Sequence, residues 1–225
     1  METITLTSTK SQFEYRLPKI KNKTKIALLS FKTNNSIPNI DETNNLFLYE
    51  YKGKVYGIVI PTGAYEINSL NLFINNELKK NNHSDIFEII PNHNTLKCTI
   101  KINDSSVKIF FTQPKSIGKL LGFNKDISEE INEGLNTVEI LKISNIFIKC
   151  NLIESSFLNG TKDCVLYNFF PNVPPGYVLN ENPIHIVHHQ LNTTEIDKIA
   201  IRITDQNDDL VNFRGEEIII TLLLQ

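Results

Sequence analysis

Short apolar runs recur along the whole chain, and clusters of Asn, Asp, Gly and Pro separate them. The run from Ile199 to Thr204 shows the pattern most clearly, because its isoleucines alternate with Ala200 and Arg202. Such alternation puts every second side chain on one face and is typical of a half-buried strand. A glycine turn at Gly53 joins two of the runs and predicts a hairpin. We predict strands at Ile4–Leu6, Phe13–Leu17, Ile26–Phe31, Leu46–Tyr51, Val55–Ile60, Phe87–Ile90, Leu96–Ile102, Val107–Phe111, Val138–Ile143, Ile146–Asn151, Val165–Phe170, Ile184–His188, Ile199–Thr204 and Ile218–Leu224.

Two segments follow a helical pattern instead. The spacing over Ile67–Lys80 places four apolar side chains on one helical stripe, namely Leu70, Phe73, Ile74 and Leu78. A second, short helix is predicted from Ser116, its N-cap, to Gly122 in the C′ position. Many short strands with two small helices are typical of a sandwich. The pattern therefore predicts an all-β fold, a single jelly-roll β-sandwich with one or two short helical insertions.

The composition agrees with a fold built from strands. The chain has 225 residues, of which 40% are hydrophobic, and its apolar residues lean towards Ile, Phe and Tyr. These side chains suit a pleated, half-buried surface. The net charge of −2 and a pI near 6.2 argue against a dedicated nucleic-acid-binding protein, which usually has a clearly basic domain.

Basic residues gather near the N-terminus, where Glu14 is the only acid between Lys10 and Lys32. This segment is either solvated surface or a basic arm that faces an anion such as a packaged genome. We expect an N-terminal strand and basic arm over residues 1–24, followed by one jelly-roll domain over residues 25–225.

The three cysteines have no metal-binding spacing and are odd in number, so we expect reduced thiols. Cys98 and Cys150 lie inside apolar strand patterns, where a thiol packs as a small hydrophobe. No apolar run approaches the ~20 residues that a membrane-spanning helix needs. We expect a soluble protein that is made inside the cell.

The residues that usually carry chemistry form no recognisable site. Three histidines cluster at His185, His188 and His189, but on a strand the middle one opposes the other two, so they do not converge on a metal. His83 and His93 lie in Asn-rich stretches and are expected to face solvent. The acidic run 205–209 lacks the glycine and the closing glutamate of a calcium loop, and a hairpin turn is favoured. Because no phosphate loop or nucleophile elbow is present either, we predict no catalytic residues, no metal and no cofactor.

Five motifs, in consistent order, resemble one family. They are Asn35-Ser36-Ile37-Pro38-Asn39-Ile40, Pro61-Thr62-Gly63-Ala64-Tyr65-Glu66-Ile67, Ser116-Ile117-Gly118-Lys119-Leu120-Leu121-Gly122-Phe123, Val173-Pro174-Pro175-Gly176-Tyr177 and the closing run from Ile203 to Glu216. The set is similar to the minor capsid proteins, of the penton type, of Polinton/Maverick elements and adintovirus-like DNA viruses. One departure is Asp208, because the family's turn usually carries glycine at that position and Asp adopts left-handed geometry less readily.

The resemblance implies a structural virion protein without enzymatic activity. A penton protein forms a ring of five copies at each vertex of the capsid, so we expect a homopentamer that also contacts a major capsid protein. The basic N-terminal segment could touch packaged DNA weakly. Arg214 either fixes the register between subunits through an acidic partner or pairs within its own hairpin. The candidate residues of the subunit interface are Pro174, Pro175, Tyr177, Asp205, Arg214 and Glu216.

Two alternatives to a capsid role remain open from the sequence. A sandwich-type binding module, specific for a receptor or a glycan, would need an exposed aromatic cluster or a convergent polar pocket. Only Tyr49, Tyr51 and Tyr56 on the predicted hairpin are candidates for it. A host-domesticated derivative of a viral gene would keep the fold without forming particles.

Overall fold

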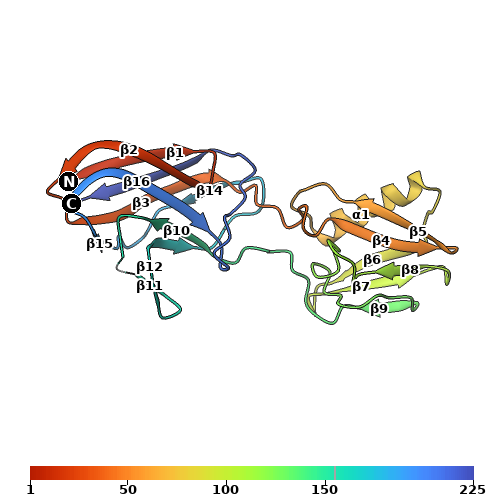
Figure 1. Ribbon diagram of the computed structural model, residues 1–225. Helices are drawn as coiled ribbons and strands as arrows, with labels where there is room; N and C mark the ends of the chain where they lie inside the picture. Colours follow the sequence, from red (N-terminus) through yellow and green to blue (C-terminus); the bar gives the residue numbers. More distant parts are fainter. Residues whose placement is uncertain (155) are drawn as a thin grey trace. The chain divides into compact units, whose positions relative to one another are not determined.

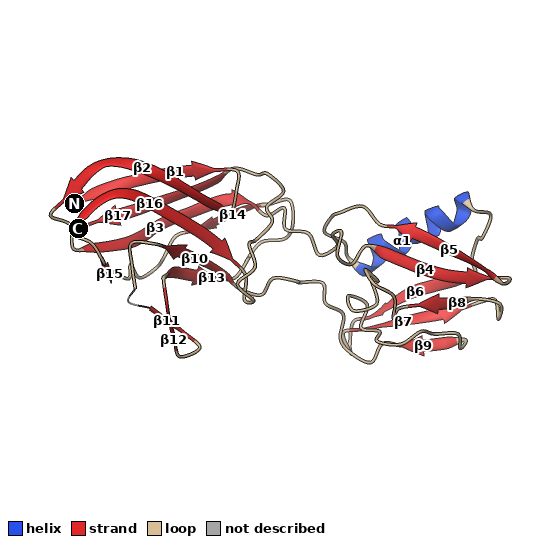
Figure 2. Ribbon diagram, viewed as in Figure 1, coloured by secondary structure: helices blue, strands red, loops and turns tan. Residues whose placement is uncertain are grey.

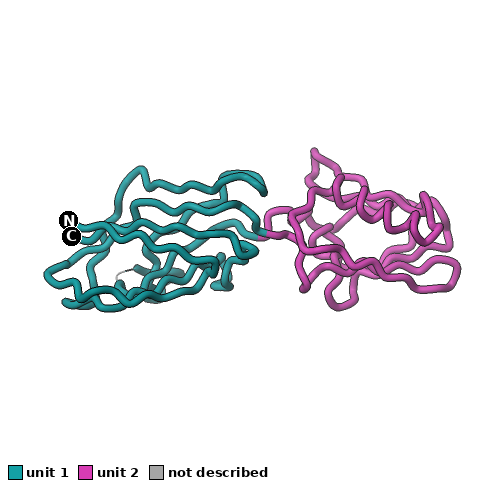
Figure 3. The backbone as a smooth tube through the Cα atoms, turned by 90° about the horizontal axis from the view of Figure 1, so that it is seen from above, with its two compact units in different colours: residues 1–37, 143–225 teal, residues 38–142 magenta. Residues whose placement is uncertain are grey.

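A computed structural model describes residues 1–154 and 156–225, and it is built mainly of strands with one α-helix (Figures 1 and 2). The chain divides into two compact units. Unit 1 contains residues 1–37 and 143–225, and unit 2 contains residues 38–142 (Figure 3). This division differs from the sequence-based expectation of an N-terminal strand and arm over residues 1–24 and one domain over residues 25–225. Residues 1–24 contribute two strands to the sandwich, and residues 38–142 form a separate body inserted into it.

Two antiparallel sheets make up most of unit 1. Sheet A has the order β1-β17-β3-β14, with β15 also paired to β3, and sheet B has the order β13-β10-β16-β2. A small hairpin, β11–β12, lies between β10 and β13 in the chain. The strands are β1 (Glu2–Ser8), β2 (Gln12–Lys21), β3 (Lys25–Asn34), β10 (Ile146–Cys150), β11 (Ser156–Leu158), β12 (Thr161–Asp163), β13 (Val165–Phe169), β14 (Val178–Glu181), β15 (His189–Gln190), β16 (Glu195–Thr204) and β17 (Ile218–Leu224).

The strand pairing in unit 1 is nested. Among its eight main strands, the first pairs with the last, β1 with β17, and the second with the seventh, β2 with β16. The third pairs with the sixth, β3 with β14, and the fourth with the fifth, β10 with β13. An antiparallel ribbon of this kind, folded over into two sheets, is a jelly roll. The predicted fold class is therefore confirmed, and unit 2 is an insertion between the third and fourth strands.

The core of unit 1 lies between its two sheets. Ile199, Ile201 and Ile203 on β16 are fully buried, as their alternation predicts. From the other sheet, Phe31 on β3 packs its ring 5.1 Å from the ring of Phe169 on β13. Cys150 belongs to the same core, and its burial raises the pKa of the thiol to about 12. This confirms that it packs as an apolar side chain.

Unit 2 has a hydrophobic core of its own. It contains two three-stranded sheets, of order β5-β4-β8 and β6-β7-β9, and a helix that packs on β6. The described helix is too short and polar to span a membrane. The elements are β4 (Leu46–Tyr51), β5 (Lys54–Val59), α1 (Ile67–Lys80), β6 (Phe87–Asn92), β7 (Lys97–Ile102), β8 (Lys108–Phe110) and β9 (Ile131–Glu133).

The two predicted helices have different outcomes. Helix α1 has the predicted bounds, and it buries Leu70, Ile74 and Leu78. The stretch from Ser116 to Gly122 forms successive turns instead of a helix. Its ends nevertheless behave as predicted, because the Ser116 hydroxyl accepts a hydrogen bond from the Gly118 N–H at 3.1 Å and Gly122 has a φ of +82°.

Two predicted strands are wrong. The stretch from Val138 to Ile143 and the stretch from Ile184 to His188 have no strand conformation. Leu141 and Ile184 are 70% and 93% exposed, so these apolar residues do not contribute to a core. Strands β14 and β15 lie on either side of the second stretch and are so short that no periodicity marks them.

Two separate cores predict two separable unfolding events. Replacing Ile100, which is fully buried in unit 2, with alanine should lower the stability of unit 2 by about 2–5 kcal/mol because it leaves a cavity. Native-state hydrogen exchange should then show faster exchange in β6 and β7 and unchanged exchange in β3. Ile201→Ala in unit 1 should give the reverse pattern. Equal loss of protection in both units in either variant would contradict the division.

Candidate functional site

The two sheets of the jelly roll have very different outer faces. In each strand the side chains alternate between the core and the outside of the sandwich. Most inward positions of both sheets are apolar. The outward positions therefore determine what each face can contact.

The outer face of sheet B is charged. Glu14 on β2 pairs with Lys198 on β16 at 2.6 Å. Further along the same strands, Glu195 pairs with Lys19 at 2.6 Å and with Lys21 at 3.1 Å. Exposed ion pairs of this kind stabilise little, but they keep a surface hydrated. Sheet B is thus well suited to face water.

The outer face of sheet A is almost free of charge. Thr5 on β1 lies opposite Thr221 on β17, which lies opposite Ser30 on β3, so one row of hydroxyl groups crosses three strands. The row beside it contains Thr7, Ile219 and Lys32. On β1, β17 and β3 the outward positions hold only two charged residues, Lys25 and Lys32. We call this surface the neutral face, and its defining residues are Thr3, Thr5, Thr7, Ser30, Ile219 and Thr221.

An exposed apolar segment borders the neutral face. Residues 177–188 run beside β3, because β14 pairs with one end of that strand and β15 with the other end. Five large apolar side chains of this segment point to solvent, and we call them the apolar edge: Tyr177, Val178, Ile184, Ile186 and Val187. Exposed apolar groups that follow one edge of a sheet make that edge a candidate contact surface.

The sequence around the apolar edge also lacks charge. Between Cys164 and Thr194 the only Asp, Glu, Lys or Arg is Glu181, although these residues make up 21% of the chain. Glu181 is already engaged, because its carboxylate accepts a hydrogen bond from the Tyr167 hydroxyl at 2.9 Å. The long stretch with one charge was the signal that could have identified this surface from the sequence. Its apolar run instead predicts a strand, since exposure cannot be seen in a pattern.

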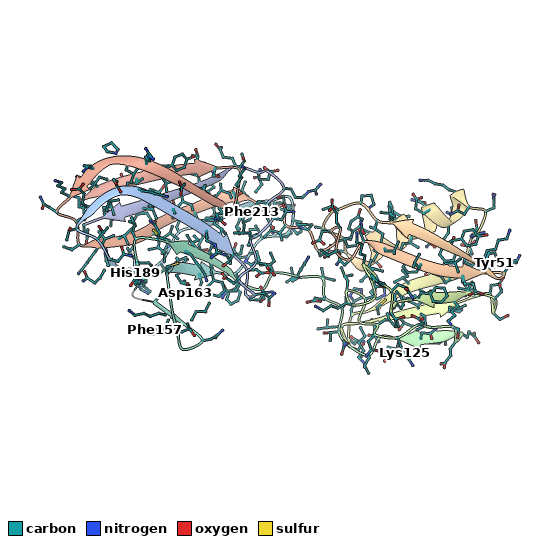
Figure 4. The ribbon with its side chains drawn as sticks, viewed as in Figure 1. Tyr51, Lys125, Phe157, Asp163, His189 and Phe213 are labelled. Atoms are coloured by element: carbon teal, nitrogen blue, oxygen red, sulfur yellow. The ribbon has the colours of Figure 1, made fainter. Side chains whose placement is uncertain are left out.

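The predicted interface residues lie in two loops. Pro174, Pro175 and Tyr177 belong to the loop between β13 and β14. Asp205, Arg214 and Glu216 belong to the segment between β16 and β17. Both loops connect strands at the end of the sandwich where residue Ile37 leads out of unit 1, and Phe213 is labelled in this region in Figure 4.

Residues at the end of β3 hold these two loops together. The Gly176 N–H donates a hydrogen bond to the Asn35 carbonyl at 2.7 Å. The Asn34 side chain donates to the Glu216 carboxylate, also at 2.7 Å. The Ser36 hydroxyl donates to the Phe213 carbonyl. The structure therefore brings the predicted residues of both loops to one end of the jelly roll, and Tyr177 also belongs to the apolar edge.

Asp205 holds the turn that follows β16 together. Asp205 is buried, and its carboxylate accepts hydrogen bonds from the N–H groups of Asn207 and Asp209 at 2.8 and 3.1 Å. Asp208 has a φ of +68°, so it does occupy the left-handed position expected of that turn. Arg214 is exposed, and within residues 1–154 and 156–225 no ion pair joins it to an acid.

A buried lysine attaches that turn to sheet B. Lys149 on β10 is 5% exposed, and its ammonium group lies 2.7 Å from the Asp163 carboxylate and 3.0 Å from the Asp208 carboxylate. Burial lowers the pKa of Lys149, but the hydrogen bonds to both acids outweigh it and leave the pKa above its ordinary value. Burial likewise raises the pKa of Asp163, and its bond to Lys149 brings it below the ordinary value. Both groups are therefore charged at neutral pH.

The histidine and tyrosine clusters do not form a chemical site in the described structure. Across the residues that the structure describes, no three His, Cys, Asp or Glu side chains gather in a way that could hold a metal. The expectation that His83 faces solvent is wrong. It is buried, and its Nδ1 lies 2.9 Å from the Tyr49 hydroxyl. The rings of Tyr51 and Tyr56 pack against it at 4.8 and 4.5 Å, so the predicted aromatic cluster largely serves to enclose this histidine.

The Lys149–Asp163 pair predicts an acid-dependent loss of stability. Because the folded pKa of Asp163 is lowered from 3.8, its contribution is present above pH 3.8 and is lost as the pH falls through the folded value. Asp163→Asn should therefore lower the urea midpoint near neutral pH and flatten its decline below pH 3.8. Asp197→Asn, at an exposed position on β16, is the matched control. An unchanged acid profile in Asp163→Asn would contradict the assignment.

Comparison with solved structures finds that the chain is similar to the mavirus penton protein, seen in a selenomethionine-labelled crystal structure. The two share 11% sequence identity with a TM-score of 0.48, and the alignment covers 100% of this chain and 99% of that chain. No protein-family model and no curated protein matches the chain.

Proposed function

We propose that the chain is a structural subunit of a viral capsid and that copies pack through the neutral face of sheet A. One observation carries this proposal, namely the difference between the two outer faces of the same jelly roll. Sheet B carries the ion pairs of Glu14 and Glu195, whereas sheet A carries rows of Thr, Ser and Ile. In a protein that stays monomeric, water solvates both outer faces, so nothing would favour removing charge from only one of them.

Physical chemistry explains why the neutral face suits a permanent contact. Charged side chains lose hydration when a surface is buried, and that cost is recovered only with well-placed partners. The cores of protein interfaces are accordingly depleted of charged residues. Threonine, serine and isoleucine can be buried at much lower cost. The neutral face and the adjoining apolar edge together offer such a surface.

The finer assignment is a penton, the protein of the capsid vertex. The jelly-roll topology is one used by viral capsid proteins, and the five motifs resemble those of penton-type minor capsid proteins. In this role the chain forms a homopentamer in the virion, next to a major capsid protein. Pro174, Pro175, Tyr177, Arg214 and Glu216 share one end of the jelly roll, and this common location supports our proposal that they contact neighbouring subunits.

The basic N-terminal residues have a minor part in this proposal. Lys19 and Lys21 both pair with Glu195, and Lys23 pairs with Glu2 at 3.2 Å. Their charge is therefore partly neutralised within the subunit. A contact between this segment and packaged DNA would be weak and sensitive to salt.

Assembly of the purified chain tests the proposed function. Size-exclusion chromatography with light scattering, followed by electron microscopy, should show five-fold rings. Thr5→Glu puts a charge on the neutral face and should weaken association by about 100-fold, because the charge would be buried without a partner.

Gln12→Glu is the matched control, since it adds the same charge to an exposed strand position on sheet B opposite Arg202. It should leave assembly unchanged, and circular dichroism should show both variants folded. A wild-type chain that remains monomeric at all concentrations, or equal effects of the two substitutions, would contradict the proposal.

A further inference from the structure

We infer that the contact between copies is heterologous, with the apolar edge of one copy lying on the neutral face of the next. This inference rests on the proposed function, and it adds which two surfaces meet. The edge and the face belong to the same sheet but are different surfaces of it. The face centres on β17, whereas the edge follows the outer side of β3.

The apolar edge needs a cover that carries no charge. Ile184 is 93% exposed, and Ile186 and Val187 beside it are also exposed. The only formal charge, on Glu181, is occupied by the Tyr167 hydroxyl of the same subunit. A partner surface with unpaired charges would lose their hydration and gain nothing from this edge.

Within unit 1, the neutral face meets that requirement apart from Lys25 and Lys32 on β3, whereas the charged face does not meet it. Contact with sheet B would place the apolar edge against Glu14, Lys198 and Glu195 and would bury their ion pairs. Contact with sheet A would place it against the hydroxyl row of Thr5, Thr221 and Ser30. This matching of uncharged surfaces is the argument for a second copy of the chain as the partner.

The sizes of the side chains favour edge on face over edge on edge. The edge presents large groups, including Tyr177, Ile184 and Ile186, whereas the centre of the neutral face presents the small groups of Thr5 and Ser30. Large side chains pack densely against small ones. A contact between two different surfaces also leaves each copy one free edge and one free face, so that successive copies can close into a ring. A contact between identical surfaces would stop at two copies.

A mixing experiment with two charged variants tests this arrangement. Ile184→Asp disables the edge and leaves the face intact, whereas Thr5→Asp disables the face and leaves the edge intact. Both side chains are exposed, so neither substitution disturbs the core, and circular dichroism checks the fold. Each variant alone should be a monomer where the wild type assembles. An equimolar mixture should form a one-to-one dimer and no larger species, because it has one intact edge and one intact face to join.

Val59→Asp is the matched control. Val59 is an exposed apolar residue on β5 of unit 2, and the charge there should leave wild-type assembly intact. Loss of assembly in this variant, with assembly kept in Thr5→Asp, would move the contact to unit 2 and overturn the inference.

The remaining outcomes separate this inference from the proposed function. If the wild type assembles but the mixture of monomeric variants stays monomeric, the contact joins like surfaces. The heterologous contact and the ring of five copies are then wrong, whereas packing of copies through sheet A stands. If Ile184→Asp assembles like the wild type, the apolar edge is not part of the contact. If the wild type itself never assembles, the proposed function fails and the inference fails with it. Native mass spectrometry and light scattering distinguish these cases directly.

Discussion

The pairing of β1 with β17 is the interaction on which the rest of the structure depends. It joins the first strand of the chain to the last, from Glu2 opposite Leu224 to Ser8 opposite Ile218. With the ends paired, the remaining main strands nest inside them and fold into two sheets around one core. The same pairing completes the neutral face, because Thr5 and Thr221 stand side by side only when β1 and β17 are in register. Fold and candidate interface therefore have a common origin.

Nested pairing also explains how one chain can hold a second unit without losing its sandwich. The connection between the third and fourth strands can be long, because the pairs outside it close independently of its length. Unit 2 occupies this connection with its own core of residues such as Phe47, Leu70 and Ile100. Loop closure costs grow slowly with length, so an insertion of this size is tolerated. The separate core lets unit 2 differ in surface from the jelly roll, whose proposed contact surface lies on sheet A.

Local patterns predicted the elements far better than their arrangement. The alternation through Ile199, Ile201 and Ile203 and the helical stripe through Leu70 and Leu78 report burial directly, and the structure confirms both. The division into two units was missed because no Gly- or Pro-rich linker marks residue 37 or residue 143. The pattern wrongly predicts a strand at Ile184, because an exposed apolar run looks like a buried one in sequence. Likewise, His83 is surrounded by polar residues in sequence and by tyrosines in space.

For the candidate site, too, local patterns predict the residues but not how they are arranged in space. The two loops with Pro174 and Arg214 could be proposed from a resemblance, but only the hydrogen bonds from Asn34 and to Asn35 show that they meet. The contrast between the outer faces needs the register of every strand, which no local pattern contains. The scarcity of charge between Cys164 and Thr194 was visible in the sequence and could have directed attention there.

Hydrogen exchange measured on assembled and unassembled protein tests the central claim most directly, because it reports which surface becomes buried. The account predicts that assembly slows hydrogen exchange in β1 and in residues 182–188. Strand β2, which belongs to the charged sheet B, should exchange at the same rate in both states. Protection that appears in β2 and leaves β1 and residues 182–188 unchanged would contradict the assignment of the neutral face as the contact between copies.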